Sequence, residues 1–519
     1  MTKYNLSDLG YKYRGVASKS SKSAKLGDWV ISDIPEDYDT QKAIDFVKRF
    51  INGICAIEVP TSLVCNLRCK YCYIEDPRMK NKYVEPDIVE KILLELPKLF
   101  PLFNPTNQKK EVYYSAWGAE PLANVHTLEV MQKVGRKLYG KDGGYKFHTS
   151  TNATLWSSKI EEVLVKFIED KAFKNIQVSL DGPKWLQDEQ RPDINRKGTY
   201  DRVEQFCKHL TEIGKKYEFK QRPYGFCSTI HLVDDNFAEK WVAAAEFFST
   251  PNTWHTNLPG LPMRMSGEDL DDEVHIKRFI EAQRLTHELL KQKASQGITV
   301  FDFYTGKLFG QASNIRTRNA FSYCSALNTQ LGVDVDGNLY PCHGPITTPL
   351  FKPFLYLGNL FDKTISFSSL YRNFSYQYGT LWTKGKCVSC PIHEYATGSV
   401  CWSCPAHNLA ISNEPSIDSA LKCIAYEESF KYWIANAKMM LDNPVLDSIP
   451  KGWYNDIEVP NTPNKKVPFD ISKIHFDPKY NNLITRGLDK WHGHCPDHEN
   501  VELTESWWIF DNFQEVLNE

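Results

Sequence analysis

Residues 54–73 read ICAIEVPTSLVCNLRCKYCY, an apolar run with the character of a strand followed at once by three closely spaced cysteines. These are Cys65, Cys69 and Cys72, spaced C-x3-C-x2-C, with a tyrosine on each side of the last one. With 14 cysteines in 519 residues, chance predicts only about 0.01 such spacings. The run therefore predicts a strand that leads into a tight loop of metal-binding thiols.

The bulk composition limits the possible partners and location of the chain. Lys plus Arg is 62 and Asp plus Glu is 64, so no basic excess indicates a nucleic-acid partner. No apolar run is long enough to span a bilayer, and the first 15 residues do not resemble a signal peptide. We expect a cytoplasmic protein without a membrane partner, in which cysteines bind metal more often than they form disulfides.

Alternating strand and helix patterns follow the cysteine loop. Helices are expected at 43–50, 86–100, 125–139, 157–170, 200–217 and 274–292, and strands in EVYYSAWG, YKFHTSTNA, NIQVSLDG, PYGFCSTIHL and near NTWHTNLPG. Repeated βα units predict a parallel sheet with its working residues at the carboxyl ends of the strands. The fold class is therefore α/β, with a partial (β/α)6 TIM-like barrel.

Three thiolates on one loop can bind three irons of a [4Fe–4S] cube and leave the fourth iron open for chemistry. A zinc knuckle is the alternative, but a fourth nearby ligand is missing from the sequence. The C-x3-C-x2-C spacing resembles the signature of the radical S-adenosylmethionine (radical SAM) enzymes. That resemblance implies a cluster on the triad and S-adenosylmethionine as cofactor.

Two further motifs resemble the cofactor-binding strand ends of that family. WGAEPL, residues 117–122, is similar to its G-G-E-P motif, with Ala119 in place of the second glycine. The resemblance implies that Gly118, Ala119 and Glu120 receive the methionine amino group. TSTNATL, residues 149–155, is similar to the T-N-G strand end and places Asn152 near the cofactor.

VSLDGP, residues 178–183, resembles the family's S-L-D-G-P segment. The resemblance implies that Ser179 and Asp181 lie near the ribose and carboxylate, that Arg191 clamps a carboxylate, and that Tyr71 or Tyr73 flanks the adenine. Taken alone, SLDGP is a strand followed by a turn, and Arg191 is as readily a structural residue. The order of these motifs behind the cysteine loop favours the cofactor site.

Residues 324–423 hold seven more cysteines in Gly-, Pro- and Asn-rich sequence. Two C-x2-C pairs allow a zinc ribbon, although seven cysteines fit neither one nor two all-cysteine zinc sites. The arrangement resembles the SPASM domain, a cysteine-rich, loop-rich auxiliary domain that carries two more [4Fe–4S] clusters. The resemblance implies an outer cluster on Cys387, Cys390, Cys401 and Cys423, and an inner one on Cys324, Cys342 and Cys404. The inner cluster then lacks a fourth cysteine, so that it has an open iron or borrows a ligand. Cys495 could supply this ligand if the tail folds back, although a free surface thiol is the better explanation of Cys495.

His343, directly after Cys342, occupies a position where formylglycine-forming relatives carry an Asp thought to be the base. A histidine has an intrinsic pKa suited to accepting a proton near neutrality. Packing beside the cluster, or a hydrogen bond to a sulfur, explains His343 equally well.

The resemblance implies a maturase that abstracts hydrogen from a precursor peptide and installs a carbon–carbon or carbon–heteroatom cross-link. A flavodoxin- or ferredoxin-type donor would supply electrons. Formylglycine formation, epimerisation and oxidation of a small alcohol or sugar are alternatives, as is an iron–sulfur or zinc module without radical chemistry. The expected divisions are an arm or cap at 1–53, the barrel at 54–305, the SPASM domain at 306–425 and a helical, aromatic extension at 426–519.

Overall fold

The structure is a computed structural model of the chain. It describes residues 21–72, 74, 83–107, 111–220, 222–250, 253–255, 263–266, 273–294, 296, 326, 329–347 and 355–370. The predictions for Tyr73, for the extension at 426–519 and for every auxiliary cysteine except Cys342 lie outside these residues.

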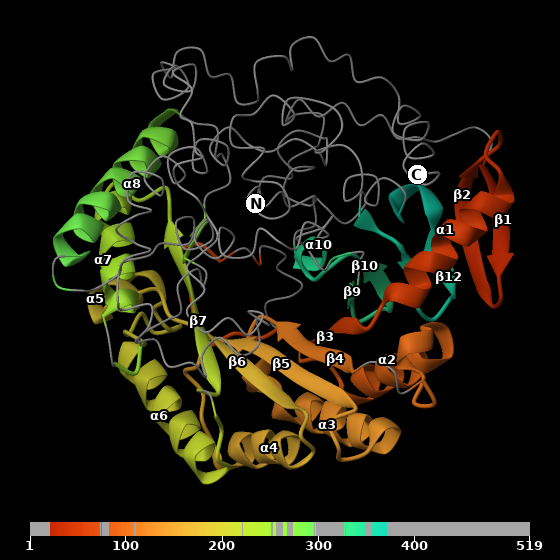
Figure 1. Ribbon diagram of the computed structural model, residues 1–519, viewed down its shortest axis with the longest axis horizontal. Helices are drawn as coiled ribbons and strands as arrows, with labels where there is room; N and C mark the ends of the chain where they lie inside the picture. The colour runs from red at the N-terminus through yellow and green to blue at the C-terminus, as the bar shows by residue number, and fades with distance from the viewer. Residues whose placement is uncertain are drawn as a thin grey trace, which may run out of the picture.

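Six neighbouring parallel strands form the centre of the fold, in the same order as in the sequence (Figure 1). They are β3 (Ala56–Ser62), β4 (Val112–Gly118), β5 (Tyr145–Thr151), β6 (Phe173–Ser179), β7 (Tyr224–His231) and β8 (Met263–Ser266). The curved sheet has helices on its outer side. Consecutive parallel strands need a crossover connection, and helices on the outer side of the sheet supply it. The predicted partial barrel is therefore confirmed.

The connecting helices are α2 (Pro86–Leu99), α3 (Val125–Tyr139), α4 (Ser158–Glu169), α5 (Lys184–Gln190), α6 (Tyr200–Lys216), α7 (Phe237–Ser249) and α8 (Glu273–Ala294), with short 3-10 turns η3 (Pro101–Phe103) and η4 (Pro121–Asn124). Helices α5 and α7 were not predicted. The strand expected near NTWHTNLPG is β8, which begins three residues after that stretch, while residues 253–255 form a turn. There the ring of His255 stacks on Phe247 of α7, at 3.7 Å between centroids, so the aromatic run packs on a helix.

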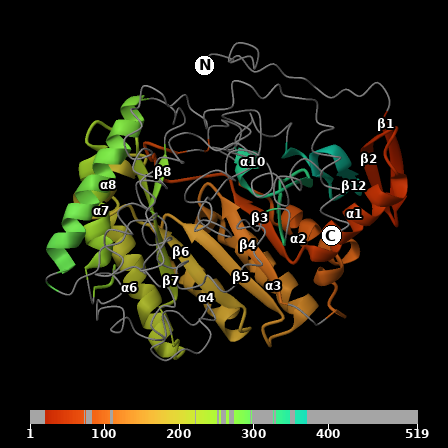
Figure 2. The same cartoon turned by 45° about the horizontal axis from the view of Figure 1, so that its top comes forward.

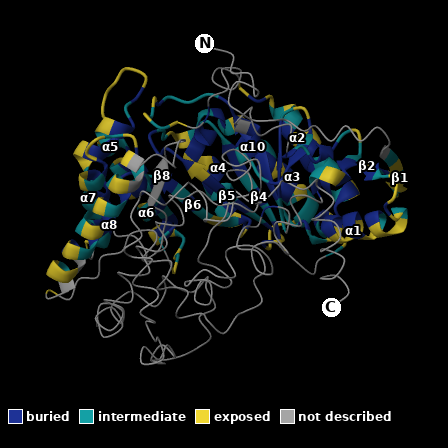
Figure 3. Cartoon of the chain, turned by 90° about the horizontal axis from the view of Figure 1, so that it is seen from above, coloured by how far each residue is buried: buried dark blue, intermediate teal, exposed yellow. Residues whose placement is uncertain are grey.

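Side chains alternate across the strands and explain how the sheet is covered. Tyr114 of β4 and Phe147 of β5 are fully buried on the helical side, where Phe147 stacks on Phe167 of α4 at 3.9 Å. Ser115 and His148, which point the other way and pair in register, are half-buried. The apolar core therefore lies between the sheet and its helices, where buried residues gather (Figure 3), and polar side chains such as Ser115 and His148 lie on the inner face of the sheet.

The sheet continues beyond β3 and has 12 strands among the described residues. The additional strands are β9 (Gln330–Val333), β10 (Asn338–Tyr340), β11 (Gly358–Asn359), β12 (Thr364–Ser366), β2 (Trp29–Pro35) and β1 (Ser21–Leu26). Strand β9 pairs parallel with β3, and β2 pairs parallel with β12. The described part of the N-terminal arm, with helix α1 (Thr40–Gly53), thus joins the end of the same sheet (Figure 2).

The short helix α10 (Gly344–Thr347) follows β10 and begins directly after His343. Among the helices of the described residues, none combines the length and apolar character needed to cross a membrane.

Candidate functional site

The cysteine loop lies against a segment that follows α5. Arg68 and Lys70 donate their backbone N–H groups to the carbonyl oxygens of Pro192 and Gln190, at 2.8 and 2.9 Å. This antiparallel pairing holds the loop in place through the backbone. The cysteine triad therefore has a defined position at the carboxyl end of β3 without any metal bond.

The three thiols of the triad are free, and nearby N–H groups point at two of them. The Sγ atom of Cys65 lies 3.4 Å from the Leu67 nitrogen and 3.7 Å from Asn152 Nδ2, and Arg191 Nη1 lies 3.9 Å from Cys69 Sγ. Burial raises the pKa of Cys65 to about 12 and that of Cys69 to about 11. Donors around buried sulfurs suit metal-bound thiolates, so the donor set fits an iron–sulfur cluster.

Gly118 lets strand β4 approach the start of the cysteine loop. Its φ is +143°, and a Cβ atom there would lie 1.9 Å from the carbonyl oxygen of Ser62. The next residue, Ala119, donates its N–H to that same oxygen at 2.8 Å. A side chain at residue 118 is therefore excluded, whereas alanine is accommodated at residue 119.

Glu120 is buried at the end of β4, with three protein donors around its carboxylate. Oε1 accepts from the Leu122 N–H at 3.0 Å and the Thr151 hydroxyl at 2.6 Å, and Oε2 accepts from the Asn152 N–H at 2.7 Å. Burial raises the pKa of Glu120, against the effect of these hydrogen bonds. The ends of β4 and β5 thus meet beside Cys65.

Asp181 is fully buried and both of its oxygens are occupied by protein donors. Oδ2 accepts from the Tyr71 hydroxyl at 2.5 Å and from Gln190 Nε2 at 3.3 Å. Oδ1 accepts from Arg191 Nε and from the Thr229 N–H, both at 3.0 Å. Asp181 therefore fixes Tyr71 and Arg191 beside the triad, and its contact with the cofactor stays a prediction.

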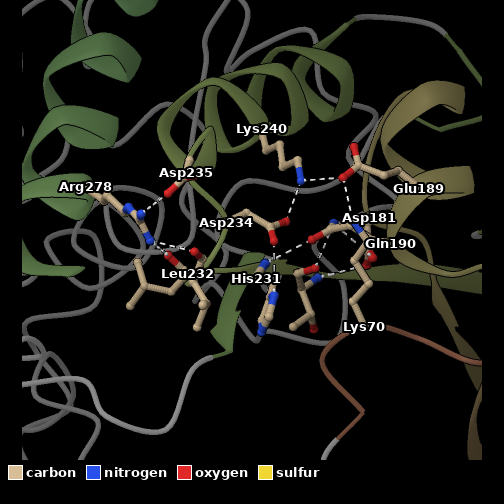
Figure 4. A network of polar contacts seen from close by, with 12 residues as sticks. Lys70, Asp181, Glu189, Gln190, His231, Leu232, Asp234, Asp235, Lys240 and Arg278 are labelled. Carbon is tan, nitrogen blue, oxygen red and sulfur yellow. Dashed lines mark hydrogen bonds and ion pairs between the residues drawn. The ribbon is translucent and has the colours of Figure 1, made fainter. Parts of the chain in front are cut away.

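A second polar network extends from this cluster toward α7 (Figure 4). Lys240, whose side chain is 1% exposed, lies 2.8 Å from Glu189 Oε1 and 2.5 Å from Asp234 Oδ2. Glu189 also pairs with Lys70 of the cysteine loop at 2.7 Å, and Asp234 lies 3.4 Å from His231 Nδ1. A buried cation thus connects the loop to the carboxyl end of β7.

His343 is held at the inner face of β3 by Glu58. Its backbone N–H donates to Glu58 Oε2 at 2.6 Å, and its Nδ1 lies 2.8 Å from Glu58 Oε1. Burial works to raise the pKa of Glu58, but the charge and hydrogen bonds of His343 lower it overall. The imidazole also stacks on Trp117, at 6.0 Å between ring centroids. Because a carboxylate only accepts, Nδ1 carries the proton of this contact.

The structure brings most of the predicted residues to one end of the sheet. Strand ends and their following loops carry Cys65, Cys69, Cys72, Tyr71, Gly118, Ala119, Glu120, Asn152, Ser179, Asp181 and Arg191. Cys342 and His343 reach the same region from β10, since β9 pairs with β3 and Gly332 of β9 lies against Cys342. The role of each residue toward a cofactor stays a prediction.

Sequence reasoning missed Glu58, Gln190, His231 and Lys240. Glu58 had one visible signal, a lone acid inside the apolar run AIEVP. Among the cysteines outside the expected cluster ligands, Cys207 is buried, whereas Cys55 and Cys227 are half-buried. Cys227 belongs to the inner-facing set of β7, opposite Ser179 of β6 in the register.

Comparison with known proteins agrees with this geometry. Residues 59–247 match the family model of the radical SAM superfamily. A cysteine-type anaerobic sulfatase-maturating enzyme of Clostridium perfringens (strain ATCC 13124) is 26% identical over 206 residues, which cover 35% of this chain and 52% of the relative. The enzyme of the same description from Clostridium novyi (strain NT) is 27% identical over 309 residues, covering 54% of this chain and 71% of the relative.

The alignment thus spans about half the length of the Clostridium perfringens relative. The solved structure of native anSMEcpe with bound AdoMet and Cp18Cys peptide has a TM-score of 0.53 and 17% identity, covering 75% of this chain and 99% of that chain. At that identity the likeness concerns the fold. The fold and the site thus agree with the match of residues 59–247 to the radical SAM superfamily.

Proposed function

We propose that this chain is a radical SAM maturase that abstracts hydrogen from a residue of a ribosomally made precursor peptide and installs a cross-link. The observation that carries the proposal is the convergence of the cysteine triad, Glu120 and Asn152 at one end of the sheet. A [4Fe–4S] cluster with bound S-adenosylmethionine supplies a carbon radical strong enough to abstract hydrogen from an unactivated carbon. The chain's own residues bind and orient this pair.

Each strand end has a distinct task in the proposed cofactor site. Cys65, Cys69 and Cys72 ligate the cluster, and the glycine turn at Gly118 lets the methionine end approach the backbone. Glu120 accepts a hydrogen bond from the methionine amino group. Its carboxylate has room for this donor, since a carboxylate has about four lone-pair sites and protein donors occupy three of them. Ser179 and Asp181 lie near the ribose and carboxylate, Arg191 clamps a carboxylate, and Tyr71 or Tyr73 flanks the adenine.

His343 is proposed to act on the substrate beside the cofactor. Glu58 fixes its ring through Nδ1, which directs Nε2 away from the carboxylate. Trp117 supports the ring from strand β4 and connects it to the Gly118–Glu120 turn. This arrangement orients a base, whereas a histidine that only packed beside a cluster would not need a buried carboxylate.

The auxiliary clusters and the redox partner belong to the same proposal. Cys342 with Cys324 and Cys404 would hold an inner cluster, and Cys387, Cys390, Cys401 and Cys423 an outer one. A flavodoxin- or ferredoxin-type protein would reduce the enzyme in the cytoplasm. Domain boundaries near residues 305 and 425 remain part of the proposal.

Two arguments support a peptide substrate. The relatives named above are described as sulfatase-maturating enzymes, and the similar fold of anSMEcpe was solved with a peptide bound. The same relatives favour formylglycine formation as a second candidate. His343, in place of the Asp of formylglycine-forming relatives, argues against formylglycine formation, because the proposed base is a different group.

Metal content is the first test. Anaerobically prepared protein should hold about 12 irons per chain, falling to about 8 when Cys65, Cys69 and Cys72 are changed to Ala. Zinc in place of iron after careful reconstitution would refute the radical mechanism.

Product analysis is the second test. Reduced protein should convert S-adenosylmethionine to 5′-deoxyadenosine and methionine, and a peptide encoded beside the gene should lose two hydrogens. An aldehyde product would indicate formylglycine formation, and a product of unchanged mass would indicate epimerisation.

A further inference from the structure

The cysteine loop and residues 190–194 form a short antiparallel ribbon, called here the loop ribbon. Its register is set by the bridge between Leu67 and Asp193, with Ile194 donating its N–H to the Asn66 carbonyl oxygen at 3.1 Å. Side chains alternate across such a ribbon. Leu67 and Asp193 are buried, whereas Arg68 and Ile194 are exposed, so these two side chains lie on the outer side of the ribbon.

The same register places Cys69 on the inner face. Cys69 lies opposite Arg191, whose Nη1 is 3.9 Å from the Cys69 sulfur. Only the thickness of one ribbon therefore separates a cluster ligand from the outer surface. Cys72, at the end of the loop, is itself exposed.

The outer face of the loop ribbon is basic. Arg68 and Lys70 project from the cysteine strand, and Arg196 and Lys197 follow directly after the other strand; all four are exposed. Ile194 lies among them with 55% of its surface exposed. We use the term basic outer face for these five residues.

The acids near this face do not cancel its charge. Glu189 is shared between Lys70 and the buried Lys240, at 2.7 and 2.8 Å. Asp193 is 7% exposed, and its Oδ1 accepts the N–H groups of Asn195 and Lys197. The face therefore presents an excess of positive charge around one apolar side chain.

We infer that the basic outer face is the docking site of an acidic one-electron carrier protein; the inference rests on the proposed radical SAM function. The carrier is oxidised by one electron and the triad cluster is reduced by one, with no bond formed or broken and no proton required. Complementary charge raises the rate of encounter, and the exposed isoleucine supplies a small apolar contact. Small interfaces of this kind suit transient redox partners.

The test compares two charge reversals of equal size. The first is Arg196→Glu with Lys197→Glu, on the basic outer face but outside the cluster loop and the cofactor site. The matched control is Lys215→Glu with Lys216→Glu, two exposed residues at the other end of α6, roughly 25 Å along the helix at 1.5 Å per residue. Iron content is measured for all proteins, because neither pair should change it.

Reduction of the iron-loaded protein is followed by the loss of cluster absorbance, with reduced flavodoxin or with dithionite. At low ionic strength, Arg196→Glu/Lys197→Glu should lower the flavodoxin rate constant about tenfold or more, and added salt should narrow the difference. The control should stay within about twofold of the wild type, and the dithionite rate should not change. Binding of oxidised flavodoxin to the immobilised protein should weaken in the same variant only.

Three results would overturn the docking site. These are equal effects of both charge reversals, a parallel loss of the dithionite rate or of iron, and unchanged flavodoxin kinetics with a raised KM for an acidic peptide. The last result would assign the face to the substrate. Failure of the proposed function looks different, since wild-type protein would then bind no iron or would not cleave S-adenosylmethionine with dithionite either.

Discussion

Asp181→Asn tests whether a buried carboxylate, and not the metal, positions the cysteine loop. The substitution keeps the side chain's shape but removes the charge opposite Arg191, 3.0 Å away, and places an amide N–H₂ among donors. Breaking a buried ion pair by removing one partner typically costs 3–5 kcal/mol. At about 1.4 kcal/mol per factor of ten, opening of the loop should become roughly 100-fold or more frequent.

Hydrogen exchange of the metal-free protein measures this opening. The amides of Arg68 and Lys70 report it directly, because they donate to the segment that Asp181 holds through Gln190 and Arg191. The exchange rates of these two amides should rise roughly 100-fold or more. The exchange rates of amides in the C-terminal half of α4, far from the loop, should not change.

The control is Asp201→Asn, at a carboxylate that is 77% exposed and paired with Lys184. An exposed pair contributes under about 1 kcal/mol, so exchange at the loop should stay close to that of the wild type. Asp181→Asn combined with Arg191→Met should lose less stability than Asp181→Asn alone, since no unpaired buried charge remains. If Asp181→Asn accelerates the loop amides no more than Asp201→Asn does, the positioning role is refuted.

Three further substitutions test other parts of the site. Gly118→Ala should lower the midpoint of thermal unfolding and the iron content together, because its Cβ would lie 1.9 Å from the Ser62 oxygen. Glu120→Gln should weaken S-adenosylmethionine binding about tenfold or more by calorimetry, and should also destabilise the fold by about 1–3 kcal/mol, because its N–H₂ group would face a buried donor in place of an acceptor oxygen. Lys240→Met should destabilise the fold by about 1–3 kcal/mol in urea, because its two carboxylate partners lose their shared cation. Burial works to raise the pKa of Asp234, but Lys240 lowers it overall. The stabilisation by the Asp234–Lys240 pair is present above the unfolded pKa of Asp of about 3.9 and is lost as pH falls through the folded pKa of Asp234. The difference in free energy of unfolding between the wild type and Lys240→Met should therefore shrink below about pH 4.

The sequence predicted the elements whose pattern is local. Strands β3 to β7 are apolar or alternating runs, and helix α3 spans the predicted residues 125–139. Such elements can be predicted because the spacing of apolar residues follows the side of the element that is buried. Strands β9 to β12 have only two to four residues each, too few for a period to appear. Their pairing in the sheet, and not their composition, forms them.

The missed parts of the site depend on contacts between distant segments. Glu58 and His343 are 285 residues apart in the chain, and nothing near either residue predicts the other. Helix α7 contains a lysine whose burial makes sense only with Glu189, 51 residues earlier, in place. The cofactor motifs could be predicted because each lies at the end of a strand with a recognisable pattern. The groups that position these motifs, such as Glu58 and Lys240, could not be predicted.

The number of protein donors differs between Glu120 and Asp181, the two buried carboxylates that were both expected near the cofactor. Asp181 has two protein donors on each oxygen, which fill the roughly four sites a carboxylate offers. Glu120 has two on Oε1 and one on Oε2, so a further donor has a place at Oε2. An ammonium group arriving at the end of β4 would complete that set, whereas the protein itself supplies four donors to Asp181. Asp181 therefore organises the loop from within the protein, and Glu120 is the carboxylate that is suited to meet the cofactor.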